Sequence, residues 1–305
     1  SYSFAVCDQN LLVYGADEDF VGQLPAALAP RVGAMLKALD LPLDDYMAFF
    51  AHLWRRWDRD EGGRTRIQLA PANLHWCSDD ALMIQKEYAV KYGVGLHIHL
   101  LETPYQKEYA RRRTGTTAVR HLYELGFLGP DVTLGHGVWL NAEDIELLAQ
   151  TGTLLCHNAS SNLRLRSGIA PLNHVSARGV PVALGIDEAG LNDDRDMLQE
   201  MRLVLNLHRT PGLEDTVPSA AQVLQMATEH GARTTGFAAQ IGMLEVGKAA
   251  DIVVMSWAHL AYPYLDADVP VVEAVVQRGR AAGVETVLVG GEVILRDGKF
   301  TKVDK

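Results

Sequence analysis

The chain has 305 residues, 48% of them hydrophobic, and a formal net charge of −10 at pH 7. This length allows one large domain with a smaller appendage, and the acidic balance argues against a nucleic-acid or anionic-lipid surface. Cys7, Cys77 and Cys156 are odd in number and widely spaced, which indicates a reducing, cytoplasmic compartment, and no apolar run approaches the ~20 residues that cross a bilayer.

The first part of the chain alternates short apolar runs with stretches of helical periodicity. In order, the predicted elements are a strand at 3–7, helices at 20–39 and 43–59, and a strand at 66–71. The loop after the second strand carries His75 and Trp76, polar and aromatic groups at a carboxyl strand end. We expect both to bind substrate, because the chemistry of a parallel barrel lies at that end of its strands. Ser78 is predicted to cap a helix over 80–92.

The strand at 93–100 contains His97 and His99, and Glu102 follows it. Side chains alternate along a strand, so the two histidines share one face. His99 lies at the strand end, where it suits a metal ligand, whereas His97 lies one layer deeper and is either a second ligand or a hydrogen-bonded core residue. Glu102 reaches the same place only if the strand ends first and the loop curls over, which Pro104 favours. A carboxylate held there could move a proton to a leaving group.

Three later strands also end in polar side chains. The remaining predicted elements are a long helix at 104–125, strands at 132–136, 153–157 and 179–187, a helix at 141–150 capped by Asn141, and helices at 192–208 and 218–230. The strand ends carry His136, His157 and Asp187, although buried strand ends are usually apolar. His136 could polarise a carbonyl or imine, or bind the metal. After the 153–157 strand, Asn158 is predicted to face substrate, while His157 has either a similar or a purely structural role.

These strand-end residues suit a divalent metal ion. Catalytic zinc takes about three ligands from His and carboxylate and leaves a position for water, and it lowers the pKa of that water. No C-x-x-C pair is present. His99 and Asp187 are therefore the predicted ligands, and iron suits the same donor types.

The pattern changes near Gly242. Short β-runs at 250–255, 284–289 and 292–295, the last two joined by a Gly290–Gly291 turn, predict part of a small β module. Only six parallel strands are predicted before it, near residues 4, 67, 95, 132, 153 and 181. An eight-stranded barrel needs two more, so we expect missing sequence before Ser1. The expected domains are 1–240 and 241–305.

Several segments resemble the amidohydrolase superfamily, in the branch of zinc-dependent deaminases and chlorohydrolases that contains the cytosine, guanine and adenosine-type deaminases and the triazine hydrolases. The matching segments are HLLET at 99–103, GHGV at 135–138, HNASSNL at 157–163 with SGIAP at 167–171, LGID at 184–187 and GMLEVGKAADIV at 242–253. The resemblance implies an α/β fold, a (β/α)8 TIM-type barrel, with a small β-sandwich domain, and a homodimer.

The same resemblance assigns roles by position. It implies that His99 and Asp187 bind zinc, that Glu102 shuttles a proton, and that His136 contacts the hydrolytic water and the substrate, with Asp187 helping to deprotonate that water. Two features depart from the family pattern. The H-x-H pair of the first strand is absent, which agrees with the strand count, and Pro71-Ala72 stands where several relatives have Pro-His.

We therefore expect a metal-dependent hydrolase acting on C–N bonds outside peptides. The first hypothesis is hydrolytic deamination of an aminated purine, pterin or pyrimidine by zinc-activated water. The alternatives are a triazine-type hydrolase that releases halide or alkylamine, and a truncated remnant without catalysis. The expected partner is a small heterocycle, with neither nucleic acid nor membrane involved.

Overall fold

The computed structural model describes residues 1–188, 190–191, 194–212 and 217–302. The chain divides into two compact units, Ser1–Leu154 and Leu155–Lys305, and each is described by itself. Residues 192–193, at the start of the predicted helix 192–208, lie outside the described part. So do residues 303–305, at the end of the expected domain 241–305.

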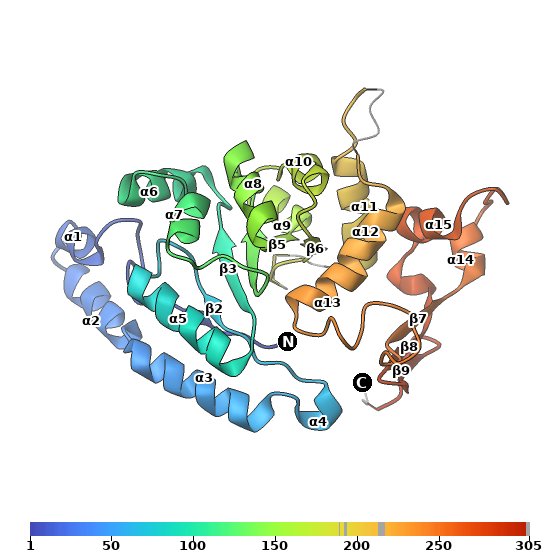
Figure 1. The fold of residues 1–305 in the computed structure, drawn as a ribbon, viewed down its shortest axis with the longest axis horizontal. Helices are drawn as coiled ribbons and strands as arrows, with labels where there is room; N and C mark the ends of the chain where they lie inside the picture. Colours follow the sequence, from blue (N-terminus) through green and yellow to red (C-terminus); the bar gives the residue numbers. More distant parts are fainter. Residues whose placement is uncertain (189, 192–193, 213–216, 303–305) are drawn as a thin grey trace. The chain divides into compact units, whose positions relative to one another are not determined.

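The first unit places helices around short parallel strands (Figure 1). Its elements are β1 Ala5–Val6, α1 Asp17–Gly22, α2 Ala29–Leu39, α3 Leu43–Trp57, α4 Asp60–Gly63, β2 Ala70–Pro71, α5 Asp79–Tyr92, β3 Leu96–Leu100, α6 Pro104–Thr114, α7 Ala118–Glu124, β4 Val132–His136 and α8 Ala142–Thr151.

The strands of this unit are parallel, as predicted. β1 pairs with β2 and β3 pairs with β4, while parallel bridges at Leu69–Leu96 and Asn73–His99 join β2 to β3. Leu96, Ile98 and Leu100 of β3 are at most 1% exposed. These three side chains share one face of β3, whereas every residue of β4 is buried, as is typical of a parallel sheet covered by helices. The parallel pairing brings the carboxyl ends of β2, β3 and β4 to one edge.

Local capping fixes the helices beside these strands. The Ser78 hydroxyl accepts the Ala81 N–H at the start of α5, and Asn141 forms a capping box with Asp144 at the start of α8. Both caps confirm the sequence prediction. Figure 1 shows α5 beside α3, a packing supported by contacts between the two helices.

Two segments that were each predicted as one helix form two helices. The segment 104–125 forms α6 and α7 because Gly115 adopts a left-handed φ of +75° and Thr117 caps a new helix. The segment 20–39 likewise divides into α1 and α2, with Pro25 in the connection.

The second unit contains the remaining strands and helices. Its elements are β5 Leu154–His157, α9 Ala159–Arg164, α10 Leu172–Ala177, β6 Val182–Leu184, α11 Met197–Leu207, α12 Ala220–Gln225, the π-helix η1 Met226–His230, α13 Gly231–Thr234, β7 Ile252–Met255, α14 Trp257–Ala261, α15 Val271–Arg278, the 3-10 helix η2 Ala281–Gly283, β8 Val284–Val289, β9 Glu292–Arg296 and β10 Lys299–Phe300. β5 and β6 are parallel, in the register Leu155–Val182 to His157–Leu184.

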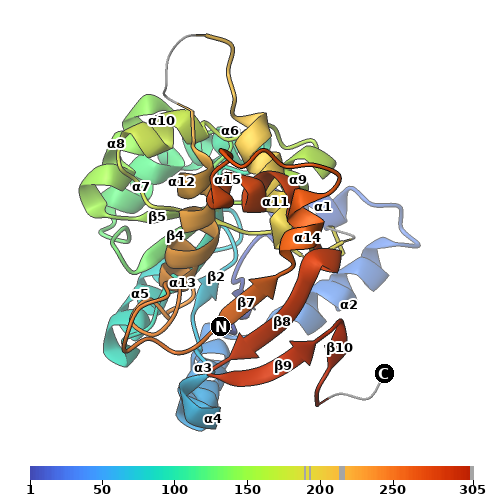
Figure 2. The same ribbon diagram turned by 90° about the vertical axis from the view of Figure 1, so that its right-hand side faces the viewer.

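The carboxyl-terminal strands form the predicted small β module. β7, β8, β9 and β10 make one antiparallel sheet (Figure 2). Gly290 and Gly291 connect β8 to β9 with φ of +58° and +82°, the two positive values that a tight hairpin turn requires. β10 was not predicted.

In the described part of the chain, no helix has both the length and the apolar composition that a membrane crossing requires.

Candidate functional site

His99 lies at the carboxyl end of β3 in a defined tautomer. Its Nδ1 contacts the carbonyl oxygen of Ala72 at 2.7 Å, and because a carbonyl only accepts, Nδ1 carries the proton and donates it. Nε2 is then the nitrogen with the lone pair. A backbone acceptor that fixes the other ring nitrogen is the usual support of a metal-binding histidine.

His136 stands beside His99 on the neighbouring strand. The two rings are 5.6 Å apart between centroids and inclined by 23°, and His136 is only 1% exposed. Its φ of +73° is left-handed, an unfavourable conformation for a side chain with a Cβ. Backbone strain of this kind concentrates at functional sites, where the surrounding structure maintains it.

The strand ends before Glu102, as predicted, and the loop that follows brings Glu102 next to His136. β3 ends at Leu100, Leu101 has a φ of +53°, and the Thr103 hydroxyl caps α6. The Glu102 carboxylate Oε2 then lies 4.0 Å from His136 Nε2. Gln106 holds the loop from both sides, because its Oε1 accepts the Glu102 N–H at 2.8 Å and its Nε2 approaches Glu102 Oε2 at 3.5 Å.

His75 is packed in an aromatic cluster. It is 5% exposed, and its ring lies 4.2 Å from that of Trp76 and 4.5 Å from that of Tyr14. Burial, with a smaller contribution from His99, lowers the pKa of His75 to about 4, so its ring is neutral at neutral pH. Its Nδ1 is buried and forms no hydrogen bond with the described residues.

Asp187 belongs to the second unit, a little beyond β6. Its Oδ2 accepts a hydrogen bond from the Ser161 hydroxyl at 2.5 Å, and its φ of +60° is left-handed, as at His136. Ser161 is fully buried on α9, so it holds the carboxylate on one side.

Asn158 lies close to Gly185 in the same unit. A Cβ at position 185 would lie 2.4 Å from Asn158 Oδ1 and 2.8 Å from Cys156 Sγ. Only glycine therefore fits beside the amide, which is 5% exposed by residue. Sequence alone shows Gly185 merely as a small residue before Asp187.

His157 has a structural partner in the second unit. Its Nε2 lies 3.0 Å from the Nε2 of His208, and both rings are buried. Burial lowers the pKa of His208 to about 4. The hydrogen bond to the buried ring of His208 favours the structural interpretation of His157 over a substrate contact.

Thus the first unit brings together His99, Glu102 and His136, with His75 and Trp76 on the neighbouring loop, while Asn158 and Asp187 lie in the second unit. The sequence did not identify Gln106 or Ser161. Gln106 stands four residues after Glu102, at helix spacing, which is a weak local indication. Ser161 lies within the HNASSNL segment that carries the resemblance, but no role of its own was predicted for it.

Residues 15–294 match the family model described as Amidohydrolase family. The chain therefore belongs to the amidohydrolase family. It is 38% identical over 253 residues to a 5'-deoxyadenosine deaminase of Methanosarcina barkeri, covering 82% of this chain and 57% of that protein. It is 35% identical over 262 residues to a 5-methylthioadenosine/S-adenosylhomocysteine deaminase of Syntrophobacter fumaroxidans, covering 85% of this chain and 58% of that protein. The chain thus spans less than two thirds of the length of these relatives.

Two solved structures extend the comparison. A zinc-bound adenosine deaminase of Xanthomonas campestris matches with a TM-score of 0.80 and 27% identity, over 86% of this chain and 58% of that chain. A zinc-bound atrazine chlorohydrolase of Arthrobacter aurescens matches with a TM-score of 0.80 and 26% identity, over the same shares.

Proposed function

We propose that this protein is a zinc-dependent hydrolase that removes the amino group from an N-heterocycle of purine, pterin or pyrimidine type. The observation that carries the proposal is the approach of the Glu102 carboxylate to His136, 4.0 Å away, beside His99. The names of the similar proteins, deaminases of adenosine derivatives, make an adenine nucleoside the first substrate to test.

The donor set fits zinc. His99 presents Nε2 because Nδ1 is bonded to Ala72, and Asp187 presents a carboxylate that Ser161 holds. Imidazole and carboxylate are the groups that catalytic zinc binds, so we propose His99 and Asp187 as ligands. Zinc in such a site makes hydroxide available near neutral pH. Iron suits the same donors.

The side chains would then divide the proton transfers. Asp187 accepts a proton from the attacking water, Glu102 carries a proton to the leaving nitrogen, and His136 donates a hydrogen bond that orients the heterocycle. The oxygen of water replaces the amino group on the ring carbon, and ammonia leaves. His75, Trp76 and Asn158 would bind the ring, the first two through their aromatic faces.

We further propose a TIM-type (β/α)8 barrel as the architecture of the whole protein, with a catalytic domain at 1–240 and part of a β-sandwich domain at 241–305. The parallel strands β1–β4 and β5–β6 and the antiparallel sheet β7–β10 support this division. A cytoplasmic homodimer completes the proposal, which light scattering of the purified protein would test.

Ammonia release is the direct test of the proposed activity. Zinc-loaded protein is incubated with adenosine, 5'-deoxyadenosine, guanine, cytosine and an aminated pterin, and we expect turnover of at least one. The zinc-bound chlorohydrolase of similar fold supports a second candidate, so chloride release from a chlorotriazine is measured in parallel. Chloride without ammonia would favour the second candidate, and neither product would contradict both.

Ser161→Ala is expected to weaken zinc binding by about 10–100-fold, the usual cost of removing an outer hydrogen bond to a metal ligand. The physical reason is that the Asp187 carboxylate loses its 2.5 Å partner. Competition with a chromophoric chelator, without substrate, measures the dissociation constant. Ser176→Ala is the control, because the Ser176 hydroxyl is buried without a hydrogen bond to the described residues. Equal affinity of the two variants would refute the role of Ser161.

A further inference from the structure

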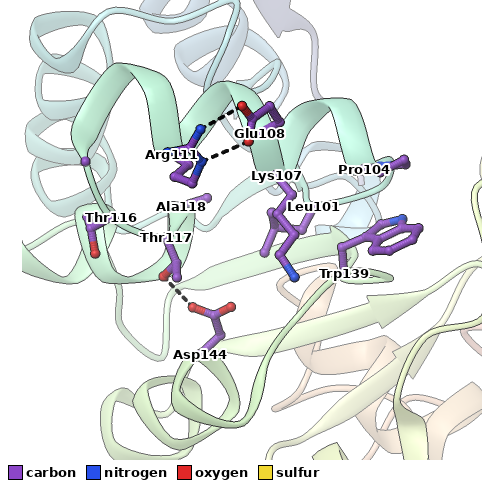
Figure 3. A pocket seen from close by; sticks show the side chains of 11 residues that line it. Leu101, Pro104, Lys107, Glu108, Arg111, Thr116, Thr117, Ala118, Trp139 and Asp144 are labelled. Atoms are coloured by element: carbon purple, nitrogen blue, oxygen red, sulfur yellow. Dashed lines mark hydrogen bonds and ion pairs between the residues drawn. The ribbon is translucent and has the colours of Figure 1, made fainter.

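A cavity of about 400 Å³ lies beside helix α6 (Figure 3). His99, Glu102 and His136 are not among its lining residues. Its walls come from one face of α6, from the link between α6 and α7, and from the segment that follows β4. The lining residues are Leu101, Pro104, Lys107, Glu108, Arg111, Gly115, Thr116, Thr117, Ala118, Trp139 and Asp144. A volume of this size is within the ~300–1,000 Å³ range of small-molecule sites.

Both oxygens of the Asp144 carboxylate, which lines the cavity, already accept hydrogen bonds from the protein. Asp144 is 1% exposed; its Oδ1 accepts from the Thr117 hydroxyl at 2.5 Å and its Oδ2 from the Asn141 N–H at 3.0 Å. Burial is the main cause that raises the pKa of Asp144. This residue therefore supports the wall and offers little attraction to a cationic ligand.

Lys107 contributes an ammonium group to the cavity. Figure 3 shows Lys107 extending its ammonium into the space between Trp139 and Asp144. Lys107 is exposed and forms no hydrogen bond or short ion pair with the described residues, although its charge interacts at longer range with the Asp144 carboxylate. Arg111 is paired with Glu108 at 2.9 Å. Arg112, which is not among the lining residues, contacts the same carboxylate at 2.7 Å. In the lining, Lys107 and Arg111 are matched in number by Glu108 and Asp144, so the attraction for an acid comes from the ammonium of Lys107 alone.

The rest of the lining is mainly apolar. Leu101, Pro104, Ala118 and the indole of Trp139 supply it, and Lys107 lines the same cavity. A flat apolar body with a single acidic group complements this arrangement, because the body can pack on the indole while the acid group receives a charge-assisted hydrogen bond from Lys107.

The cavity is connected to the Glu102 loop through the backbone. Leu101 precedes Glu102, and its carbonyl oxygen accepts the Trp139 N–H at 3.0 Å, while the Leu100 carbonyl oxygen accepts the Gly137 N–H at 3.1 Å. The two walls that carry Leu101 and Trp139 are thus the segments that follow the strands of His99 and His136. A molecule bound between them would contact both segments.

We infer that this cavity is a second binding site, separate from the catalytic one, for a small organic acid with a flat apolar body. The carboxylate of the bound acid pairs with Lys107, and its body packs on Trp139. Occupancy stabilises the folded protein by mass action.

The probe is 1-naphthoate, compared with the neutral 1-naphthylmethanol and the cationic 1-naphthylmethylamine by titration calorimetry. The wild-type protein should bind the acid most tightly and the cation least. Lys107→Gln should weaken the binding of 1-naphthoate about tenfold, the range for a hydrogen bond to a charged group, and Lys107→Arg should retain most of it. Lys37→Gln, which removes an exposed lysine on α2, is the matched control and should bind as the wild type does.

A second measurement locates the bound probe. The indole N–H resonance of Trp139, identified by its loss in Trp139→Phe, should shift on addition of 1-naphthoate, and at the same probe concentration the melting temperature should rise less in Lys107→Gln than in the wild type. Equal binding by Lys107→Gln and the wild type, equal binding of the cation and the acid, or an unmoved Trp139 resonance would each overturn the inference.

Discussion

Replacing Glu102 by glutamine is expected to lower the rate of heterocycle deamination by about 10³-fold, within the range that a positioned acid–base group contributes. The substitution preserves the shape of the side chain and its capacity to bond with Gln106, which now holds the Glu102 loop by two contacts. It removes the ability to accept a proton and release it to the leaving nitrogen. Initial rates of ammonia release at saturating substrate measure the effect.

The zinc content of Glu102→Gln should remain that of the wild type, because Glu102 is not among the proposed ligands. This separates a defect in proton transfer from a loss of metal. Glu87→Gln, on the exposed side of α5, is the control for removing a carboxylate from the first unit and should be fully active. An active Glu102→Gln enzyme, with more than about a tenth of the normal rate, would be incompatible with this acid–base role.

Replacing His99 by glutamine should abolish zinc binding at the concentrations where the wild type is saturated. The loss should exceed the ~10–100-fold that follows the removal of an outer partner, since the coordinating nitrogen itself disappears. The hydrogen bond from His99 to Ala72 is lost as well. Metal analysis of dialysed protein and titration with a zinc-sensitive dye give the occupancy and the dissociation constant.

The same variant should also lose the thermal stabilisation that zinc gives, because a ligand stabilises only the state that binds it. Chelator treatment should lower the melting temperature of the wild type, and zinc should restore it, while neither should affect His99→Gln. His52→Gln, at an exposed position on α3, is the control. A His99→Gln protein that keeps its zinc through dialysis would exclude His99 as a ligand.

The ends of the strands could be predicted from the sequence, because the hydrophobic pattern that marks a strand involves only neighbouring residues. The runs that contain His99, His136 and His157 are short, apolar and separated by helical stretches. Each forms a strand, and the histidine is the last residue of β4 and β5 and the last but one of β3. The break before Glu102 was also predictable, since Pro104 disfavours continuation of the strand. Helix continuity was less predictable: the division at Gly115 depends on a single left-handed residue inside a strongly helical composition.

The contacts that hold the candidate site residues in place could not be predicted, because they join residues far apart in the sequence. Tyr14 packs on His75 from 61 positions away, and the Ser161 hydroxyl reaches Asp187 across 26 positions. A hydroxyl or an aromatic ring has many possible partners in an unfolded chain. Only the completed packing selects one of them.

The sequence by itself determined which side chains stand at the ends of the parallel strands, since alternation and hydrophobic periodicity are properties of neighbouring residues. The tertiary structure decided what those side chains touch: the Ala72 carbonyl that sets the tautomer of His99, the Gln106 amide that holds Glu102, and the cavity beside Lys107 and Trp139. These contacts arise only when separate strands and helices are brought to one edge, because hydrogen bonds and packing depend on distances of a few ångströms that residue spacing does not specify.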